Sequence, residues 1–229
     1  MSRALPLLLA GSLALAQGPR DPVRTLGPLL GIPYAEDAVQ DQAGAWTRFA
    51  DPSARLPAPG LNCSGFLVTA ARRLLGYRGS PAEAARDRLG DSGPGAAAGQ
   101  DWDFGWDLVL NLSEGHPRRW VLPEGERPAP GAGARALAGF RVQDPLAWAT
   151  LRPRLRAGRV YLATFLRGAK SLRHHHVALL LVDRDGRLWL YQTLPRGRVH
   201  RLNLDDPAGF QRLCAMFGPG ERLLLLETE

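Results

Sequence analysis

This chain of 229 residues is poor in cysteine and, after its first twenty residues, contains no long apolar run. Its two cysteines, Cys63 and Cys214, are too few for a disulfide scaffold or a cysteine-rich structural zinc site. None of the later apolar runs is long enough to cross a bilayer as a helix, so we expect no transmembrane segment in the mature chain. With 45% hydrophobic and 22% charged residues, the composition is that of a globular protein, which excludes a disordered or collagen-like chain.

The first sixteen residues differ in pattern from the rest of the chain. Arg3 precedes an apolar stretch from Ala4 to Leu13, and Ala14-Leu15-Ala16 comes before the polar Gln17. A basic, an apolar and a small-residue region in this order are typical of a secretory signal peptide. We therefore expect residues 1–16 to be a signal peptide, and residues 17–229 to form a single domain that is exported to the periplasm or out of the cell.

Lysine is almost absent too, because Lys170 is the only lysine among 29 basic residues. The formal net charge of +7 is therefore carried by arginine. An exported protein with this charge can contact anionic components of the cell envelope. Its arginines form no run of five or more and are not interleaved with aromatic residues as in RNA-binding segments, so we expect no nucleic-acid partner.

The apolar pattern changes along the chain from helical to strand-like. Helical spacing, with caps or glycines at the ends, predicts helices over 63–75, 81–89, 145–156 and 207–217. Short apolar or alternating runs predict strands over 160–166, 177–183, 188–193, 199–204 and 222–227. Stretches rich in glycine, alanine and proline predict an inserted loop-rich segment at about 91–139. The expected fold class is α+β, with N-terminal helices packed on a C-terminal antiparallel β-sheet.

Cys63 lies at the predicted start of the first of these helices. The unpaired N–H groups and the positive end of the helix dipole favour a thiolate there, so we expect the pKa of Cys63 to lie below that of a free cysteine. Such a thiolate would be a nucleophile. A cysteine at this position is equally compatible with a small residue packed in the core.

Three consecutive histidines, His174, His175 and His176, come directly before the predicted strand 177–183. A histidine at the end of a buried strand can act as a general base. Neighbouring residues of a strand point to opposite faces, so the three imidazoles cannot share one metal ion in tetrahedral geometry. We therefore expect no metal site and no other cofactor.

Gln192 is a polar residue within the next apolar run. A two-residue turn at Asp185-Gly186 would pair Leu179 with Gln192 and bring Gln192 near the histidine end of the neighbouring strand. An imidazole N–H would satisfy its amide and fix the histidine tautomer. With this register, His175 shares the face of Gln192, whereas His176 faces away unless it lies outside the regular strand.

The residues around these positions resemble the motifs of a known family. The three motifs are Asn62-Cys63-Ser64-Gly65-Phe66, His176-Val177-Ala178 and Gln192. In this order they resemble the papain-like cysteine peptidase superfamily in its bacterial NlpC-type branch, whose members cleave cell-wall peptides. The resemblance implies that Cys63 is the nucleophile, that His176 is the base with His175 as the alternative base, and that Gln192 orients the base.

Two further segments extend the resemblance. Gly31-Ile32-Pro33-Tyr34 is similar to the segment that supplies an oxyanion-stabilising tyrosine in the NlpC-type branch, which implies this role for Tyr34, 29 residues before Cys63. The block 144–206 is similar to the YfaT-like group of uncharacterised exported bacterial proteins, and Tyr191-Gln192-Thr193 stands where that group has Tyr-His-Thr. Asn62 replaces the aspartate that usually precedes the nucleophile.

The resemblance implies an exported bacterial thiol hydrolase that cleaves amide bonds in peptidoglycan stem peptides by a Cys-His-Gln mechanism. A second hypothesis is a catalytically inactive papain-like module that binds cell-wall peptides or a partner protein. A third is a thiol acyltransferase or lipid-directed enzyme of the same superfamily. Both enzymes need an accessible and reactive Cys63, and the binding module does not.

Overall fold

An eight-stranded antiparallel sheet forms the centre of the protein, as seen in the computed structural model, which describes residues 21–88, 104–128, 137–167 and 174–229. The strand order is β4-β3-β10-β6-β7-β8-β9, with β5 also paired to β10. The strands are β3 (Arg118–Leu122), β4 (Gly125–Pro128), β5 (Phe140–Arg141), β6 (Val160–Arg167), β7 (His174–Val182), β8 (Leu188–Gln192), β9 (His200–Asn203) and β10 (Glu221–Thr228). The expected signal peptide, residues 1–16, lies outside the described residues.

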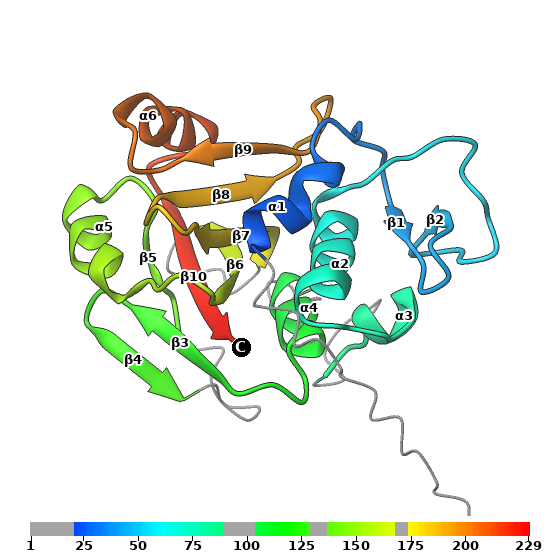
Figure 1. The fold of residues 1–229 in the computed structure, drawn as a ribbon, viewed down its shortest axis with the longest axis horizontal. Coiled ribbons are helices and arrows are strands. Elements are labelled where there is room, and N and C mark those ends of the chain that lie inside the picture. The colour runs from blue at the N-terminus through cyan, green and yellow to red at the C-terminus, as the bar shows by residue number, and fades with distance from the viewer. Residues whose placement is uncertain (1–20, 89–103, 129–136, 168–173) are drawn as a thin grey trace, which may run out of the picture.

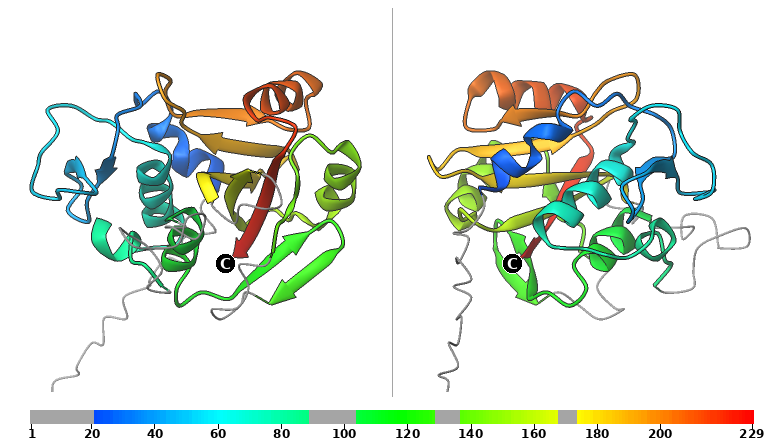
Figure 2. Two further views of the ribbon diagram at one scale, coloured as in Figure 1. Left: turned by 180° about the vertical axis from the view of Figure 1, so that it is seen from behind. Right: turned by 45° about the vertical axis from the view of Figure 1, so that its right-hand side comes forward.

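Helices cover both faces of this sheet (Figure 1). On one face lie α1 (Pro22–Leu26), α2 (Cys63–Leu74) and α4 (Phe104–Leu112), and on the other lie α5 (Pro145–Leu151) and α6 (Pro207–Met216). Figure 2 shows the same layers from two further directions, with β10 running through the middle of the sheet. The α+β class with an antiparallel sheet is confirmed.

The central strands are apolar on both sides because each face packs against helices. In β7, Val177, Leu179 and Leu181 belong to the core under α2 and α4. Ala178 and Leu180 belong to the second core under α5 and α6. The predicted strands at 160–166, 177–183, 188–193, 199–204 and 222–227 are confirmed as β6 to β10, and β7 begins earlier than expected, at His174. Within the described residues, no helix has the length and apolarity that a membrane span requires.

Helix α2 confirms the prediction made for 63–75, and its capping explains where it begins. The side chain of Asn62 accepts a hydrogen bond from the backbone N–H of Gly65 over 2.7 Å, which satisfies one of the free donors of the first turn. Gly65 itself lies against β1 (Ala38–Gln40), which pairs with β2 (Trp46–Arg48) in a separate two-stranded sheet. A Cβ atom on Gly65 would lie 1.9 Å from the carbonyl oxygen of Ala38, so only glycine allows this close approach.

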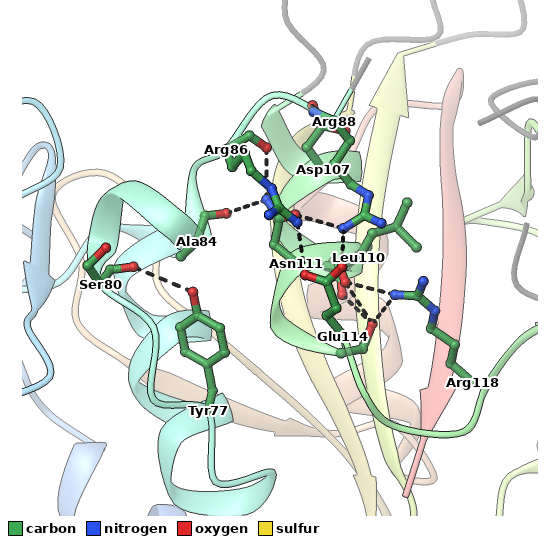
Figure 3. Close-up of polar contacts among 12 residues, drawn as sticks. Tyr77, Ser80, Ala84, Arg86, Arg88, Asp107, Leu110, Asn111, Glu114 and Arg118 are labelled. Carbon is green, nitrogen blue, oxygen red and sulfur yellow. Dashed lines mark hydrogen bonds and ion pairs between the residues drawn. The ribbon is translucent and has the colours of Figure 1, made fainter. Parts of the chain in front are cut away.

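The predicted helix over 81–89 is wrong in its length, since α3 covers only Pro81–Ala84. Its start is as expected, with a capping box between Ser80 and Glu83. Its end is decided by a tertiary contact, because the side-chain amide of Asn111 donates to the carbonyl oxygens of Ala84 and Arg86 over 2.9 and 2.8 Å (Figure 3). The chain therefore turns along α4 instead of continuing the helix.

The interpretation of 91–139 as a loop-rich segment is wrong for its described part, which contains α4, β3 and β4. Every residue of α4 after Phe104 is buried. Its polar residues Asp107 and Asn111 are buried against residues 84–88, so they do not mark the solvent face by which an amphipathic helix is identified in a sequence. The third and fourth predicted helices are confirmed: α5 continues into a 3-10 turn, η3 (Arg152–Arg154), and α6 starts after Asp206.

The hairpin between β7 and β8 has a different turn from the expected one. Asp183 pairs with Arg187 through a backbone hydrogen bond of 2.9 Å, so the loop has three residues, and Gly186 closes it with a φ of 79°. A type I turn followed by a glycine of positive φ is a common three-residue hairpin connection. The register is therefore shifted by one residue, and Leu179 lies opposite Tyr191 instead of Gln192.

Candidate active site

Cys63 is the first residue of α2, and it lies partly buried against the core of that face. Its Sγ atom is 3.9 Å from Ser64 Oγ. Burial raises the pKa of the Cys63 thiol, and this effect outweighs the backbone N–H groups of Val177, Ser64 and Cys63 and the hydroxyl of Ser64, which act in the opposite direction. The expected lowering of the Cys63 pKa is therefore wrong, because a helix N-terminus that is buried also removes the water that would solvate a thiolate.

His176 and Gln192 form the hydrogen bond that the sequence predicts for a base and its orienting residue. His176 Nε2 lies 2.9 Å from Gln192 Oε1, and the Gln192 side chain is fully buried. The rings of Phe165 and Phe217 stack on each other, with centroids 4.3 Å apart, and both lie beside the imidazole, with centroids 5.3 and 5.6 Å from it. The shifted hairpin register explains the pair, because it moves Gln192 to the face that His176 shares.

This hydrogen bond also determines the tautomer of His176. Gln192 Oε1 can only accept, so Nε2 of His176 carries the hydrogen, and Nδ1 carries the lone pair of the neutral ring. Within the described residues, Nδ1 has no hydrogen-bond partner. Burial lowers the pKa of His176 to about 4, although Gln192 and the charge of Glu221 favour the protonated ring. The imidazole is therefore neutral at pH 7, with Nδ1 able to accept a proton.

The structure brings Cys63 near β7 but not into contact with the His176 imidazole. The backbone N–H of Val177, the residue after His176, lies close enough to favour the Cys63 thiolate. The side chains of Val177 and His176 point to opposite faces of the sheet, Val177 toward α2 and His176 toward Phe217. No hydrogen bond joins Cys63 Sγ to an imidazole nitrogen in the part of the chain that the structure describes.

The other two histidines of the triplet have different partners. His175 Nε2 lies 2.8 Å from Glu221 Oε2, and the same carboxylate accepts from Arg167 Nε over 3.1 Å, so the alternative base contacts β10 and not Gln192. The His174 ring packs on Trp106, with centroids 5.4 Å apart. No group of three or more potential metal-ligating His, Cys, Asp or Glu side chains occurs among the described residues.

Tyr34 lies near Cys63 although it stands 29 positions earlier in the chain. Backbone hydrogen bonds of 3.1 and 3.3 Å join Leu61 to Pro33 and Ala35, and these pairings bring the Tyr34 segment beside the start of α2. Burial raises the pKa of Tyr34, and the negative charge of a Cys63 thiolate raises it further. The Tyr34 hydroxyl is therefore protonated at neutral pH and able to donate a hydrogen bond.

Two residues at this site were missed by the sequence analysis, His200 and Met216. Gln192 Nε2 lies 3.5 Å from His200 Nε2 and 3.3 Å from Met216 Sδ. His200 faces Gln192 directly in the β8–β9 pairing. That pairing could have indicated His200 only if the register of β9 had been known, and nothing in the local sequence places Met216 beside Gln192.

Cys214, the second cysteine, lies in α6 on the opposite face of the sheet from α2, and both cysteines are free thiols. No protein-family model, no curated protein and no solved structure matches this chain. The function is therefore inferred from the residues and geometry of the chain itself.

Proposed function

We propose that the protein is an exported thiol hydrolase that cleaves amide bonds in peptidoglycan stem peptides, with Cys63 as nucleophile, His176 as general base and Gln192 as the residue that orients the base. One observation carries the proposal. The 2.9 Å hydrogen bond from His176 Nε2 to Gln192 Oε1 fixes the neutral tautomer of His176, with its lone pair on Nδ1. His176 directly precedes Val177, whose backbone N–H lies close to Cys63.

The raised thiol pKa and the lowered imidazole pKa define how such a reaction starts. Cys63 and His176 are both neutral at pH 7, so the thiol proton moves to Nδ1 as the Sγ–carbon bond forms. The protonated imidazole then gives this proton to the leaving amine, as the carbon–nitrogen bond breaks and a thioester remains on Cys63. Water, activated by the neutral imidazole, attacks the thioester and releases the carboxylic acid and the free thiol.

The start of α2 and Tyr34 offer donors for the oxyanion of this reaction. Asn62 takes the N–H of Gly65, whereas the N–H groups of Cys63 and Ser64 lie close enough to the Cys63 sulfur to favour its thiolate. These two groups point toward the helix N-terminus, where a negative charge is favoured. The protonated hydroxyl of Tyr34, which lies near Cys63, is a further donor.

The first proton transfer requires His176 Nδ1 and Cys63 Sγ to approach each other. They make no hydrogen bond in the resting structure, because the imidazole lies on the other face of the sheet, against Phe165 and Phe217. Catalytic hydrogen bonds are often long in the free enzyme and shorten when substrate binds. The proposal therefore includes a rearrangement at the start of β7 that turns the His176 side chain to the face of Cys63 in the complex with the peptide.

A second function is favoured by the same separation. A thiol with a raised pKa and no hydrogen bond to an imidazole is suited to packing as well as to attack. In this case the chain is a catalytically inactive module, and the surface around Cys63 and Tyr34 binds cell-wall peptides or a partner protein without cleaving them.

Cleavage of stem peptides distinguishes the two functions. The purified protein is incubated with stem peptides, and the newly released amines are identified by mass spectrometry. We expect cleavage by the wild-type chain and by Cys214→Ala, the matched control on the far face of the sheet, and none by Cys63→Ala. Binding of the peptides without cleavage would replace the hydrolase by the binding module, and neither binding nor cleavage would overturn both.

A further inference from the structure

A chain of hydrogen bonds crosses three neighbouring strands and ends at the proposed base. His200 Nδ1 lies 2.9 Å from the backbone carbonyl oxygen of Arg198. His200 Nε2 lies 3.5 Å from Gln192 Nε2, and Gln192 Oε1 lies 2.9 Å from His176 Nε2. The bonds therefore run from the start of β9 through β8 to β7.

The direction of each bond follows from the first one. A carbonyl oxygen only accepts, so His200 Nδ1 carries the hydrogen and the neutral ring has its lone pair on Nε2. That lone pair requires a donor, which is the NH₂ group of Gln192. The second hydrogen of the same NH₂ group faces Met216 Sδ over 3.3 Å, and a thioether sulfur can also only accept.

Both hydrogens of the Gln192 amide are thus directed away from His176, and its oxygen is directed toward it. If the amide were turned by 180°, its oxygen would face the His200 lone pair and its NH₂ group would face His176 Nε2. His176 would then carry its lone pair on Nε2 and its hydrogen on Nδ1. In that tautomer Nδ1 could no longer accept the proton of Cys63.

We propose that His200 is a positioning residue of this site: through the Gln192 amide it keeps the hydrogen of His176 on Nε2 and the lone pair on Nδ1. Its effect on the tautomer depends only on the hydrogen bonds described, whereas its effect on turnover rests on the proposed hydrolase function. His200 is half-buried, at the far end of this series of hydrogen bonds from His176. Among the described residues, its ring makes no hydrogen bond to Cys63 or to the His176 imidazole.

The tautomers can be measured directly in the full chain by long-range ¹H–¹⁵N correlation spectra of ¹⁵N-labelled histidine at pH 7. We expect the hydrogen on Nε2 in His176 and on Nδ1 in His200. In His200→Phe, which removes the acceptor, we expect His176 to become a mixture of both tautomers. His200→Gln, whose side-chain oxygen can accept from the Gln192 amide, should restore the Nε2–H form, and His116→Phe serves as the control for loss of a surface histidine.

Two results would overturn the proposal: a wild-type His200 with its hydrogen on Nε2, or a folded His200→Phe variant in which His176 keeps the pure Nε2–H tautomer. The first needs no variant, so it decides the matter even if His200→Phe does not fold. Where stem peptides are cleaved, kcat of His200→Phe should fall about tenfold at unchanged KM and recover in His200→Gln. Absence of cleavage in the wild type would contradict the hydrolase and leave the tautomer measurement as the test of His200.

Discussion

His176 Nε2 donates a hydrogen bond to Gln192 Oε1 over 2.9 Å. The two residues lie on the adjacent strands β7 and β8, and the length of the connecting loop sets the register that brings them together. In the observed register Leu179 and Tyr191 face each other under α2. Gln192 is one position from Tyr191 and His176 is three positions from Leu179, so both lie on the other face of the sheet. A two-residue turn would have put His175 on the face of Gln192. The third loop residue, Gly186 at a φ of 79°, selects His176 instead.

The buried thiol of Cys63 should react slowly with iodoacetamide at neutral pH. Because burial raises its pKa, the fraction of thiolate at any pH below that pKa is smaller than in an unfolded chain. We expect the pH of half-maximal alkylation of Cys63 to lie above the value for the same residue in denatured protein, read by peptide mass spectrometry in a Cys214→Ala background. A midpoint below the denatured value would mean that the imidazole contacts the thiol already in the free protein.

His176 should make the stability of the protein depend on pH. Its pKa of about 4 lies below the ordinary value of 6.5, so between these values the unfolded chain binds a proton that the folded protein excludes. The contribution of His176 is fully present above pH 6.5 and is lost as the pH falls toward 4. At pH 4 the loss for this group is up to about 3 kcal/mol.

The measurement is urea unfolding of the wild type and His176→Gln at pH 7 and pH 4. Other groups titrate in both proteins, so only the difference between the two pH dependences reports on His176. We expect the wild type to lose more stability on acidification than the variant does. Equal losses would show that the imidazole is not held neutral by burial.

Gly65→Ala should destabilise the protein by about 2 to 4 kcal/mol, since over-packing against a rigid group is costly. The added methyl group would lie 1.9 Å from the backbone oxygen of Ala38, which cannot move away as a side chain could. Gly218→Ala is the matched control, because nothing lies within 4 Å of the position of its Cβ. Similar unfolding free energies for the two variants would contradict the close packing of α2 on β1.

Tyr34→Phe tests the oxyanion donor. The hydroxyl is protonated at neutral pH, since burial raises its pKa, so its removal takes away a donor and no charge. In the hydrolase we expect kcat for stem peptides to fall roughly 10- to 100-fold with little change in KM, since the hydrogen bond is made to the transition state. A change in KM alone would assign Tyr34 to peptide binding.

Some of the site could be predicted because its determinants are local. Asn62 caps the helix from the position directly before it, and the period of the apolar residues that follow Cys63 gives the helix its direction and length. The five apolar runs after residue 159 become strands because each run has the length and alternation of a buried strand. These features depend on neighbours in the chain, and a sequence contains that information.

Only the tertiary structure decided the rest. The register of β7 on β8 depends on one backbone conformation at Gly186, and it selects His176 over His175 as the partner of Gln192. The end of α3 depends on a hydrogen bond from Asn111. Helix α4 was not identified in the sequence because even its polar residues are buried. The N-terminus of α2 favours a thiolate by local physics, but the packing around Cys63 removes solvent and raises its pKa. Sequence therefore determined which groups are present and on which elements, while burial and register, which involve residues far apart in the chain, determined their charge and partners.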